Sequence, residues 1–208
     1  MAEYNSRVLI VDDDEAVRDS LSWLMQSVGL DTRCFDSADA LLREDLSLHQ
    51  GCLILDIRMP GMSGLELQAL LAERGVALPV IMISGHADVP MAVRALKAGA
   101  FDFIEKPFND QALLDIVQRA IEHDRKQRES LDQWRVWRER MDMLTPRERE
   151  VMHEVVAGSP NKVIATRLGV SLKTVESHRA RVMEKLEASS ISQLVRICLA
   201  LDETQGKP

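Results

Sequence analysis

Residues 53–61 read LILDIRMPG and place one carboxylate between an apolar run and a turn. Leu53 to Leu55 are apolar without interruption, which is typical of a strand buried on both faces of a parallel sheet. The adjacent Pro60 and Gly61 exclude a helix and a continuing strand, so we expect a loop there. Asp56 is therefore predicted to lie at the carboxyl end of a buried strand, where open α/β sheets place their ligands.

The charge of the chain is divided unevenly along its 208 residues, of which 46% are hydrophobic and 28% charged. Residues 1–122 hold 20 acidic and 10 basic residues, whereas residues 123–208 hold 13 acidic and 16 basic residues. An acidic first part and a basic second part indicate two different tasks, and a basic part suits a nucleic acid.

Cysteines and hydropathy indicate a cytoplasmic protein without a membrane segment. Cys34, Cys52 and Cys198 lie in apolar strings and form no C-x-x-C pair, so buried, reduced thiols are expected. The sequence shows no signal-peptide pattern and no apolar run near the roughly 20 residues that a membrane span requires.

The first 122 residues alternate between strand patterns and helix patterns. Strands are expected at Val8–Val11, Thr32–Phe35, Leu53–Leu55, Pro79–Gly85 and Phe101–Glu105. Helices are expected at Ala16–Val28, from a Ser37 cap to Leu46, at Gly64–Arg74, at Val89–Ala98 and after an Asn109 cap. This alternation predicts an α/β fold: a flavodoxin-like (βα)5 domain over residues 1–122, with a parallel five-stranded sheet and helices on both faces.

The remaining residues predict helices alone. Residues 119–143 contain no Pro or Gly, so we expect the last helix to continue as a helical linker over residues 123–143. A solvated flexible tether is the alternative, but Trp134 and Trp137 favour packing against another element.

A small all-α domain is predicted over residues 144–201, with four helices and a disordered tail at residues 202–208. Thr145, Pro146 and Glu148 form the capping box that begins its first helix, which ends near Gly158. The other helices are expected at Asn161–Leu168, Leu172–Leu186 and Ser192–Leu201. Two short helices around a turn at Gly169 are typical of a helix-turn-helix.

Polar side chains follow four of the five predicted strands: Asp12 and Asp13, then Asp56, Ser84 and Lys106. Because the carboxyl ends of parallel strands meet at one edge of a sheet, we expect these side chains to converge. Three carboxylates in one pocket repel one another unless a cation lies there, and Mg²⁺ prefers such oxygen ligands. The pocket suits transfer of a phosphoryl group to a carboxylate, with Lys106 and Ser84 binding product oxygens.

Each of these residues also has a simpler interpretation when it is taken alone. The acids at residues 12–14 could cap the following helix and interact with its dipole, and we assign Asp14 to this capping. Ser84 could belong to a simple turn, and Lys106 could be a solvated loop lysine. Convergence at one sheet edge, in order and at suitable spacing, favours the functional interpretation.

Four strings resemble the receiver domain of two-component response regulators over residues 7–122: VDD (11–13), LD (55–56) with MPG (59–61), ISG (83–85), and Phe103 with KPF (106–108). The resemblance implies that Asp56 is the phosphoacceptor of a sensor histidine kinase. It implies that Asp13, Asp56 and the carbonyl of Arg58 ligate Mg²⁺, with Asp12 acting through water. Ser84 and Phe103 would be the switch pair.

Two further strings, NKVIA (161–165) and VSLKTVESHR (170–179), resemble the LuxR/FixJ-type DNA-binding domain from about Leu144 to Leu199. The whole chain resembles a FixJ-type response regulator of the NarL/FixJ family. In the predicted helix at 172–186, Val175, Val182 and Leu186 share one side and are expected to face a core. The opposite side, which includes Lys173, suits the major groove. Our expected base contacts are Glu176, Ser177 and Ala180, and our expected phosphate contacts are Lys162, Thr174, His178, Arg179 and Arg181.

These observations predict a transcriptional regulator that is switched by phosphorylation of Asp56. It is expected to promote only its own phosphorylation and dephosphorylation and otherwise not to be an enzyme. Phosphorylation is expected to favour a homodimer through the fourth helix and fifth strand, near Met91, Arg94 and Ala95, and binding to a two-fold promoter site. RNA polymerase is left open as a further partner, and no membrane contact is expected.

Two other functions remain as alternatives. A phosphatase of the haloacid dehalogenase kind would use Asp12 and Asp14 as a D-x-D pair. A receiver could also bind a protein partner without being phosphorylated.

Overall fold

A computed structural model describes residues 6–85 and 89–205. Its internal contacts divide the chain into two compact units, Met1–Arg128 and Glu129–Pro208. Among the described residues, no helix is both long enough and apolar enough to cross a membrane.

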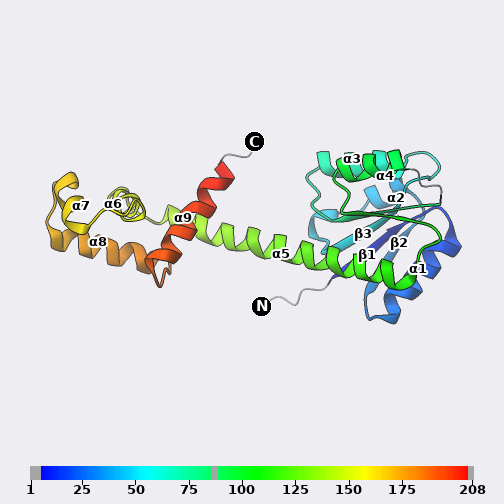
Figure 1. Cartoon of the computed structure of the whole chain (residues 1–208), viewed down its shortest axis with the longest axis horizontal. Helices are drawn as coiled ribbons and strands as arrows, with labels where there is room; N and C mark the ends of the chain where they lie inside the picture. Colours follow the sequence, from blue (N-terminus) through cyan, green and yellow to red (C-terminus); the bar gives the residue numbers. More distant parts are fainter. Residues whose placement is uncertain (1–5, 86–88, 206–208) are drawn as a thin grey trace. The chain divides into compact units, whose positions relative to one another are not determined.

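The first unit is a parallel five-stranded sheet in the order β2-β1-β3-β4-β5, covered by helices on both faces (Figure 1). This is the flavodoxin-like fold that the sequence predicts. The strands are β1 (Arg7–Val11), β2 (Asp31–Phe35), β3 (Gly51–Asp56), β4 (Val80–Ser84) and β5 (Asp102–Glu105). The helices are α1 (Glu15–Ser27), α2 (Ala38–Leu42), the 3₁₀ helix η1 (Leu46–Leu48), α3 (Gly64–Glu73), α4 (Val89–Lys97) and α5 (Asp110–Asp142).

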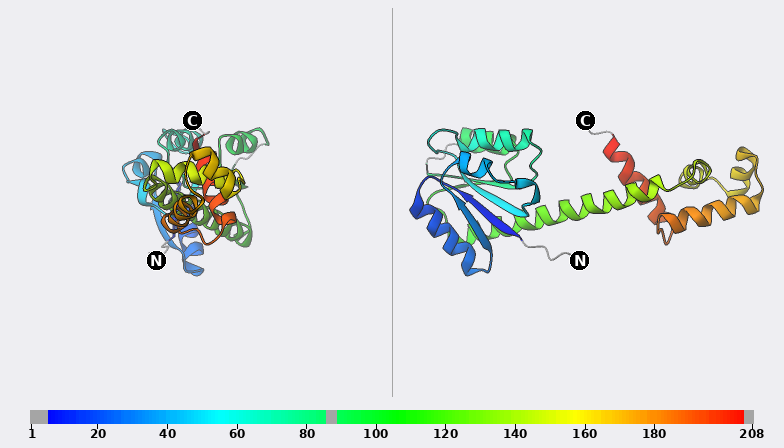
Figure 2. Two further views of the ribbon diagram at one scale, coloured as in Figure 1. Left: turned by 90° about the vertical axis from the view of Figure 1, so that its left-hand side faces the viewer. Right: turned by 180° about the vertical axis from the view of Figure 1, so that it is seen from behind.

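Alternate residues of the central strands enter two separate cores, because successive side chains of a strand point to opposite faces. Leu9 and Leu55 pack with residues of α2, α3 and α4. Ile10 and Ile54 pack with residues of α1 and α5 on the other face. Figure 2 shows the same layers from the opposite side. The register pairs Val11 with Leu55 and Asp56 with Ile83, so the carboxyl ends of β1, β3 and β4 lie at one edge.

Two expectations about the first unit are wrong. The α2 helix ends at Leu42 rather than Leu46, because Asp45 caps the separate helix η1 by accepting the Ser47 N–H at 3.0 Å. Cys34 is exposed rather than buried, since it lies on the edge strand β2, where most side chains are not covered. Of the residues near the expected dimer face, Arg94 is exposed and Ala95 is fully buried, and the dimer itself stays a prediction.

The α5 helix is continuous from Asp110 to Asp142, as the helical interpretation of residues 119–143 predicts. The boundary between the two compact units falls within this helix, after Arg128. The predicted domain boundaries at residues 122/123 and 143/144 stay predictions.

The second unit contains the end of α5 and the helices α6 (Pro146–Val156), α7 (Asn161–Leu168), α8 (Leu172–Lys185) and α9 (Ile191–Gln205). Trp134, Trp137 and Met141 of α5 pack against its hydrophobic core. The predicted disordered tail is wrong for residues 202–205, which continue α9, because no Pro or Gly interrupts the helix before Gly206. Residues 206–208 lie outside the described residues.

Candidate functional site

Asp56 is the last residue of β3, and every residue of that strand is buried. The chain then turns back sharply, because the Gly64 N–H donates to the Ile57 carbonyl at 2.9 Å. A Cβ atom at Gly64 would lie 2.2 Å from the Asp56 carbonyl oxygen, so only glycine allows α3 to begin this close to the strand. Ser63 and Glu66 form a capping box that fixes the first turn of α3 and the end of the loop.

Lys106 connects the carboxylates of two strands at this edge. Its Nζ donates to Asp12 Oδ2 at 2.6 Å and to Asp56 Oδ1 at 2.7 Å. The other Asp56 oxygen, Oδ2, accepts the backbone N–H of Arg58 at 2.6 Å. Asp12 is 1% exposed and Asp56 is 5% exposed, so these are charged hydrogen bonds in a largely buried site. The predicted convergence of Asp12, Asp56 and Lys106 is confirmed.

The cluster is one positive charge short of neutrality when all three groups are ionised. Burial raises the pKa of Asp56, and Lys106 offsets this increase only in part because Asp12 shares the same ammonium and repels Asp56. Burial tends to lower the pKa of Lys106, but its hydrogen bonds to Asp12 and Asp56 outweigh that effect and the pKa is raised. Lys106 therefore stays an ammonium, and the two carboxylates favour the approach of a further cation.

The residues at this edge are suited to a hard cation, although they do not form a complete metal cage. Among the residues that the structure describes, no cluster of three or more Asp, Glu, His or Cys side chains could hold a metal ion. Asp12 and Asp56 are brought together, whereas Asp13 is exposed and does not join such a cluster. Two buried carboxylates with net negative charge are nevertheless the oxygen donors that Mg²⁺ prefers. The predicted set of Asp12, Asp13, Asp56 and the Arg58 carbonyl stays a prediction.

Ser84 and Phe103 lie on neighbouring strands. Ser84 is 1% exposed, and its Oγ donates to Met91 Sδ of α4 at 3.9 Å. Its backbone carbonyl accepts the Lys106 N–H at 2.8 Å, which links the ends of β4 and β5. Phe103 is partly buried and packs, like Met91, against the core under α4. Ser84 thus connects Lys106 with α4, and Phe103 packs against the same core as Met91, while the roles of the predicted switch pair stay predictions.

Arg18 of α1 also supports the acidic cluster. Its Nη1 donates to the backbone carbonyls of Asp12 at 2.8 Å and Asp13 at 3.0 Å. Arginine at the fifth or sixth position after an acid has no distinctive pattern, so only the folded chain reveals this contact. The assignment of Asp14 is confirmed, because its Oδ1 caps α1 by accepting the Ala16 N–H at 2.9 Å.

The α7 and α8 helices form the predicted helix-turn-helix. Ser171 caps α8, and Arg179 of α8 donates to Asn161 Oδ1 of α7 at 2.7 Å. Val175 and Val182 are buried in the core of the second unit, as predicted, together with Leu186. Arg179, an expected phosphate contact, therefore already makes a contact that joins the two helices.

The other expected DNA contacts differ in their exposure. Thr174 and His178 are partly buried, Thr174 lies 2.8 Å from the Ser171 hydroxyl, and the buried His178 Nδ1 has no hydrogen-bond partner among the described residues. The remaining six residues are exposed and available to a ligand: Lys162, Lys173, Glu176, Ser177, Ala180 and Arg181. The exposed side of α8 is thus polar and carries small side chains, as a helix that enters the major groove requires.

The buried Glu148 forms an ion pair with the partly exposed Lys185 inside the second unit. Glu148 Oε2 accepts from Lys185 Nζ at 2.6 Å and from the Thr145 N–H at 2.9 Å. These contacts lower the pKa of Glu148 to about 2, with the lysine hydrogen bond as the largest cause. The capping box predicted Glu148 and Thr145, but no local pattern identifies Lys185 as the partner.

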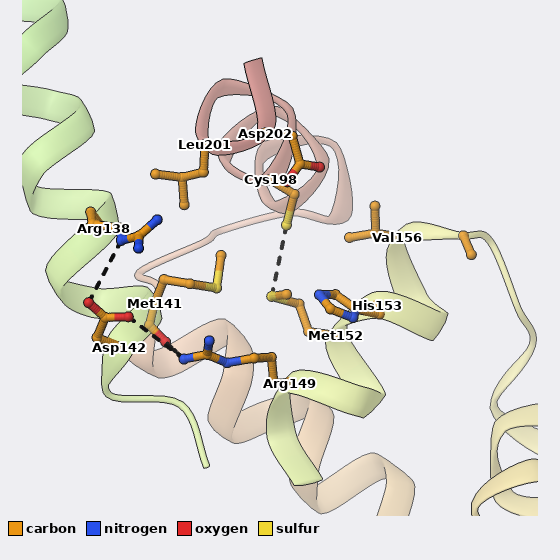
Figure 3. A pocket seen from close by; sticks show the side chains of 11 residues that line it. Arg138, Met141, Asp142, Arg149, Met152, His153, Val156, Cys198, Leu201 and Asp202 are labelled. Carbon is orange, nitrogen blue, oxygen red and sulfur yellow. Dashed lines mark hydrogen bonds and ion pairs between the residues drawn. The ribbon is translucent and has the colours of Figure 1, made fainter. Parts of the chain in front are cut away.

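A cavity of about 500 Å³ lies in the second unit where α5, α6 and α9 meet (Figure 3). Its apolar wall includes Met141, Met152 and Leu201. Asp142 Oδ2 lies 3.8 Å from Arg138 Nε and Asp142 Oδ1 lies 3.8 Å from Arg149 Nη2, which is loose for ion pairs. None of the expected DNA contacts lines this cavity, so it is separate from the candidate nucleic-acid surface.

Two known protein families match this chain, each over a different range of residues. Residues 8–118 match the family described as "Response regulator receiver domain", and residues 142–198 match "Bacterial regulatory proteins, luxR family". The chain is a two-component response regulator. This membership implies a histidine kinase and DNA as its partners.

Relatives resemble the response regulator over nearly its whole length. It is 46% identical over 200 residues to the transcriptional regulatory protein FixJ of Rhizobium meliloti, covering 96% of this chain and 97% of FixJ. It is 44% identical over 194 residues to the transcriptional regulatory protein TdiR of Thauera aromatica, covering 93% of this chain and 86% of TdiR.

Solved structures of response regulators are similar to it as well. The structure of StyR aligns with a TM-score of 0.83 and 39% identity over 94% of this chain and 98% of StyR. Full-length FixJ from B. japonicum aligns with a TM-score of 0.60 and 39% identity over 95% of this chain and 98% of that chain. These likenesses support both the receiver fold and the NarL/FixJ type that the sequence indicates.

Proposed function

We propose that the response regulator accepts a phosphoryl group on Asp56 from a sensor histidine kinase, and that this modification increases its affinity for promoter DNA. The observation that carries the proposal is the buried Asp56 carboxylate, with Lys106 at 2.7 Å and the Arg58 N–H at 2.6 Å. Donors on both oxygens orient the carboxylate, while the net negative charge of the cluster favours a metal cation.

In the proposed reaction an Asp56 oxygen attacks the phosphorus of phosphohistidine, a P–O bond forms, and the P–N bond breaks. The leaving imidazole takes a proton from solvent. Mg²⁺, when bound, would neutralise negative charge on the transferring oxygens. Asp13, Asp56 and the Arg58 carbonyl would hold it, with Asp12 acting through water. Lys106 would bind a phosphoryl oxygen, and Ser84 would turn from Met91 to bind another.

We propose that phosphorylation also favours a homodimer through α4 and β5. Val93 and Leu96 on α4 are exposed apolar residues, 43% and 47% exposed, and Arg94 between them is also exposed. Phe103 and Met91 lie beneath this surface, in the core that Ser84 contacts. A change at Ser84 could therefore alter α4. A symmetric dimer would present two helix-turn-helix units to a two-fold DNA site, and RNA polymerase is a further proposed partner.

We propose that α8 enters the major groove with Glu176, Ser177 and Ala180 at base edges. The expected phosphate contacts are Lys162, Thr174, His178, Arg179 and Arg181, and Lys173 lies on the same outer side of α8. The response regulator would act on no substrate beyond its own phosphorylation and dephosphorylation.

The test of the proposed function measures phosphoryl uptake and DNA affinity together. The full chain is treated with acetyl phosphate with and without Mg²⁺, and uptake is followed by intact mass. Affinity is measured for a duplex that the treated protein selects from a random-sequence pool, and oligomeric mass is measured in parallel. Uptake without any gain in DNA affinity, or no uptake at all, would contradict the proposal. In the same assay, Arg181→Ala should lower the salt dependence of binding by about one counterion.

A further inference from the structure

A second buried carboxylate lies at the opposite end of the strand that carries Asp56. Asp124 of α5 is 1% exposed, and its Oδ2 accepts the backbone N–H of Gly51 at 2.8 Å. Gly51 is the first residue of β3 and Asp56 is the last. Asp124 therefore fixes α5 to the amino end of the same strand whose carboxyl end is the phosphoacceptor site.

Arg128 completes this contact from the next turn of α5. Its Nε donates to Asp124 Oδ1 at 3.0 Å and to Oδ2 at 2.9 Å, and its Nη2 donates to the His49 carbonyl. Two residues one helical turn apart thus bind two backbone groups of the chain that enters β3. We call Asp124 and Arg128, with the backbone of His49 and Gly51, the α5 clamp.

The backbone that the clamp holds has little freedom to move. Gly51 has φ +124°, and a Cβ atom there would lie 2.2 Å from the Arg7 carbonyl oxygen of β1. Gln50 accepts the Arg7 N–H at 2.8 Å, which joins the same segment to β1. Because the segment is fixed to the sheet, hydrogen bonds to it fix α5 to the sheet as well.

The position of the clamp along α5 suggests what it does. The five residues after Arg128, 129–133, are all exposed. Trp134 and Trp137 then pack against the core of the second unit. The clamp therefore lies just before the stretch in which α5 passes from one compact unit to the other. Coupling between distant sites is carried by rigid elements, so a helix that is loose at its base would transmit little.

The chemistry of the pair favours a positioning role over a purely stabilising one. Asp124 is buried and the Arg128 side chain is 27% exposed, so bringing these charges together costs desolvation free energy that their attraction often fails to recover, and the ion pair is weak support for stability. A well-packed apolar pair at positions 124 and 128 could hold α5 against the sheet, but it would leave the Gly51 N–H and the His49 carbonyl without these partners. The buried Asp124 and the partly buried Arg128 instead specify one register between α5 and β3.

We propose that the α5 clamp is required for phosphorylation of Asp56 to change DNA affinity. This inference rests on the proposed function and adds two positioning residues that do not contact the phosphoacceptor. Asp124 and Arg128 would hold the base of α5 in one orientation, so that a change in the receiver reaches the DNA-binding domain instead of being lost in motion of the helix.

The experiment uses the full chain and compares Asp124→Ala, Arg128→Gln and the double variant Asp124→Asn/Arg128→Gln. In the double variant an amide pair can restore the hydrogen bonds without the charges. Glu122→Gln is the matched control, because Glu122 precedes Asp124 by two residues on α5 but forms only surface ion pairs with Arg125 and Lys126. Phosphoryl uptake from acetyl phosphate, hydrogen exchange of the Gly51 amide, and affinity for the selected duplex are measured for each.

We expect Asp124→Ala to take up phosphoryl at the wild-type rate and to exchange the Gly51 amide at least tenfold faster. Its gain in DNA affinity on phosphorylation should fall at least fivefold. Arg128→Gln should show the same loss. The double variant should recover the gain to within twofold of wild type, which a merely destabilised receiver would not do. Glu122→Gln should match wild type in all three measurements.

Two unfavourable results are distinguishable. A wild-type gain in affinity that persists fully in Asp124→Ala, despite faster exchange at Gly51, overturns the clamp alone. A wild-type protein that takes up no phosphoryl, or takes it up without any gain in affinity, overturns the proposed function and the clamp together. If Asp124→Ala does not fold, Arg128→Gln and the double variant decide the question by the same criteria.

Discussion

Asp56 in the first unit and Glu148 in the second are both buried acids, and each binds one lysine and one backbone N–H. The lysine distances are 2.7 Å for Lys106 to Asp56 and 2.6 Å for Lys185 to Glu148. Nevertheless the pKa of Asp56 is raised, whereas the pKa of Glu148 is lowered to about 2. Two acid–lysine pairs with similar distances thus have pKa shifts of opposite direction.

The difference comes first from burial, which is the largest cause of the raised pKa of Asp56, and then from the number of carboxylates that share each lysine. Lys106 also binds Asp12, which is itself buried and repels Asp56. Lys185 binds Glu148 and the Met143 carbonyl, which carries no net charge. The charge of Glu148 is balanced by Lys185, whereas Asp56 and Asp12 together carry one more negative charge than Lys106 can balance. That excess negative charge is what a site for cations and phosphoryl transfer requires.

The largest effect should come from replacing Asp56, which shares Lys106 with Asp12. Asp56→Asn should abolish phosphoryl uptake from acetyl phosphate, because an amide cannot act as the nucleophile. Intact mass with Mg²⁺ present measures this. Glu148→Gln is the control and should retain wild-type uptake. Residual stoichiometric uptake by Asp56→Asn would show that another residue accepts the group.

Replacing the acid by its amide should stabilise the protein at Asp56 and destabilise it at Glu148. A carboxyl with a raised pKa adds stability below its ordinary pKa and loses it as the pH rises, so ionised Asp56 disfavours folding at pH 7. Asp56→Asn should therefore stabilise the first unit at neutral pH. Circular dichroism during thermal unfolding checks the direction, and a lower midpoint for Asp56→Asn would contradict it.

Glu148→Gln should destabilise the second unit by about 3 kcal/mol at pH 7, since a pKa that falls from 4.5 to about 2 corresponds to roughly that free energy. The lowered pKa stabilises above pH 4.5, the ordinary value, and this contribution is lost as the pH falls to about 2. Urea unfolding followed by the fluorescence of Trp134 and Trp137 measures it, because both pack against this core. An unchanged urea midpoint would show that Lys185 contributes little.

A smaller effect is expected when Asp56 is given its own lysine. Asp12→Asn removes the repelling carboxylate, so the pKa of Asp56 should fall and the acid limb of the uptake–pH profile should move to lower pH. If Asp12 acts on Mg²⁺ through water, the Mg²⁺ concentration for half-maximal uptake should rise roughly 10- to 100-fold. A profile that stays in place would mean that burial alone, without Asp12, sets the pKa.

The smallest effect should come from a third acid whose pKa is also lowered to about 2, Glu122. Its side chain is 44% exposed and its partners Arg125 and Lys126 lie on the surface of α5. Solvent and salt screen such pairs, so Glu122→Gln should leave the urea midpoint unchanged within error. A loss as large as that of Glu148→Gln would show that burial is not the deciding factor.

Local sequence patterns were sufficient to predict the strands, most of the helices and the members of the acidic cluster. Asp56, Asp12 and Lys106 could be placed together because each follows an apolar run, and parallel strands end at one edge. The capping box at Thr145 and the buried side of α8 follow from spacing alone, as the positions of Val175 and Val182 confirm. Hydrophobic period and capping residues act over a few positions, so a linear sequence displays them.

Contacts between distant residues could not be read in this way. Lys185 lies 37 positions from Glu148, and Gly51 lies 73 positions from Asp124. Nothing in the run of α5 distinguishes the buried Asp124 from the exposed Glu122, because each acid has a basic residue three or four positions later. Their burial depends on which side of α5 meets the sheet. The pKa of Asp56 likewise depends on Asp12 reaching the same ammonium, which packing brings about and composition does not reveal.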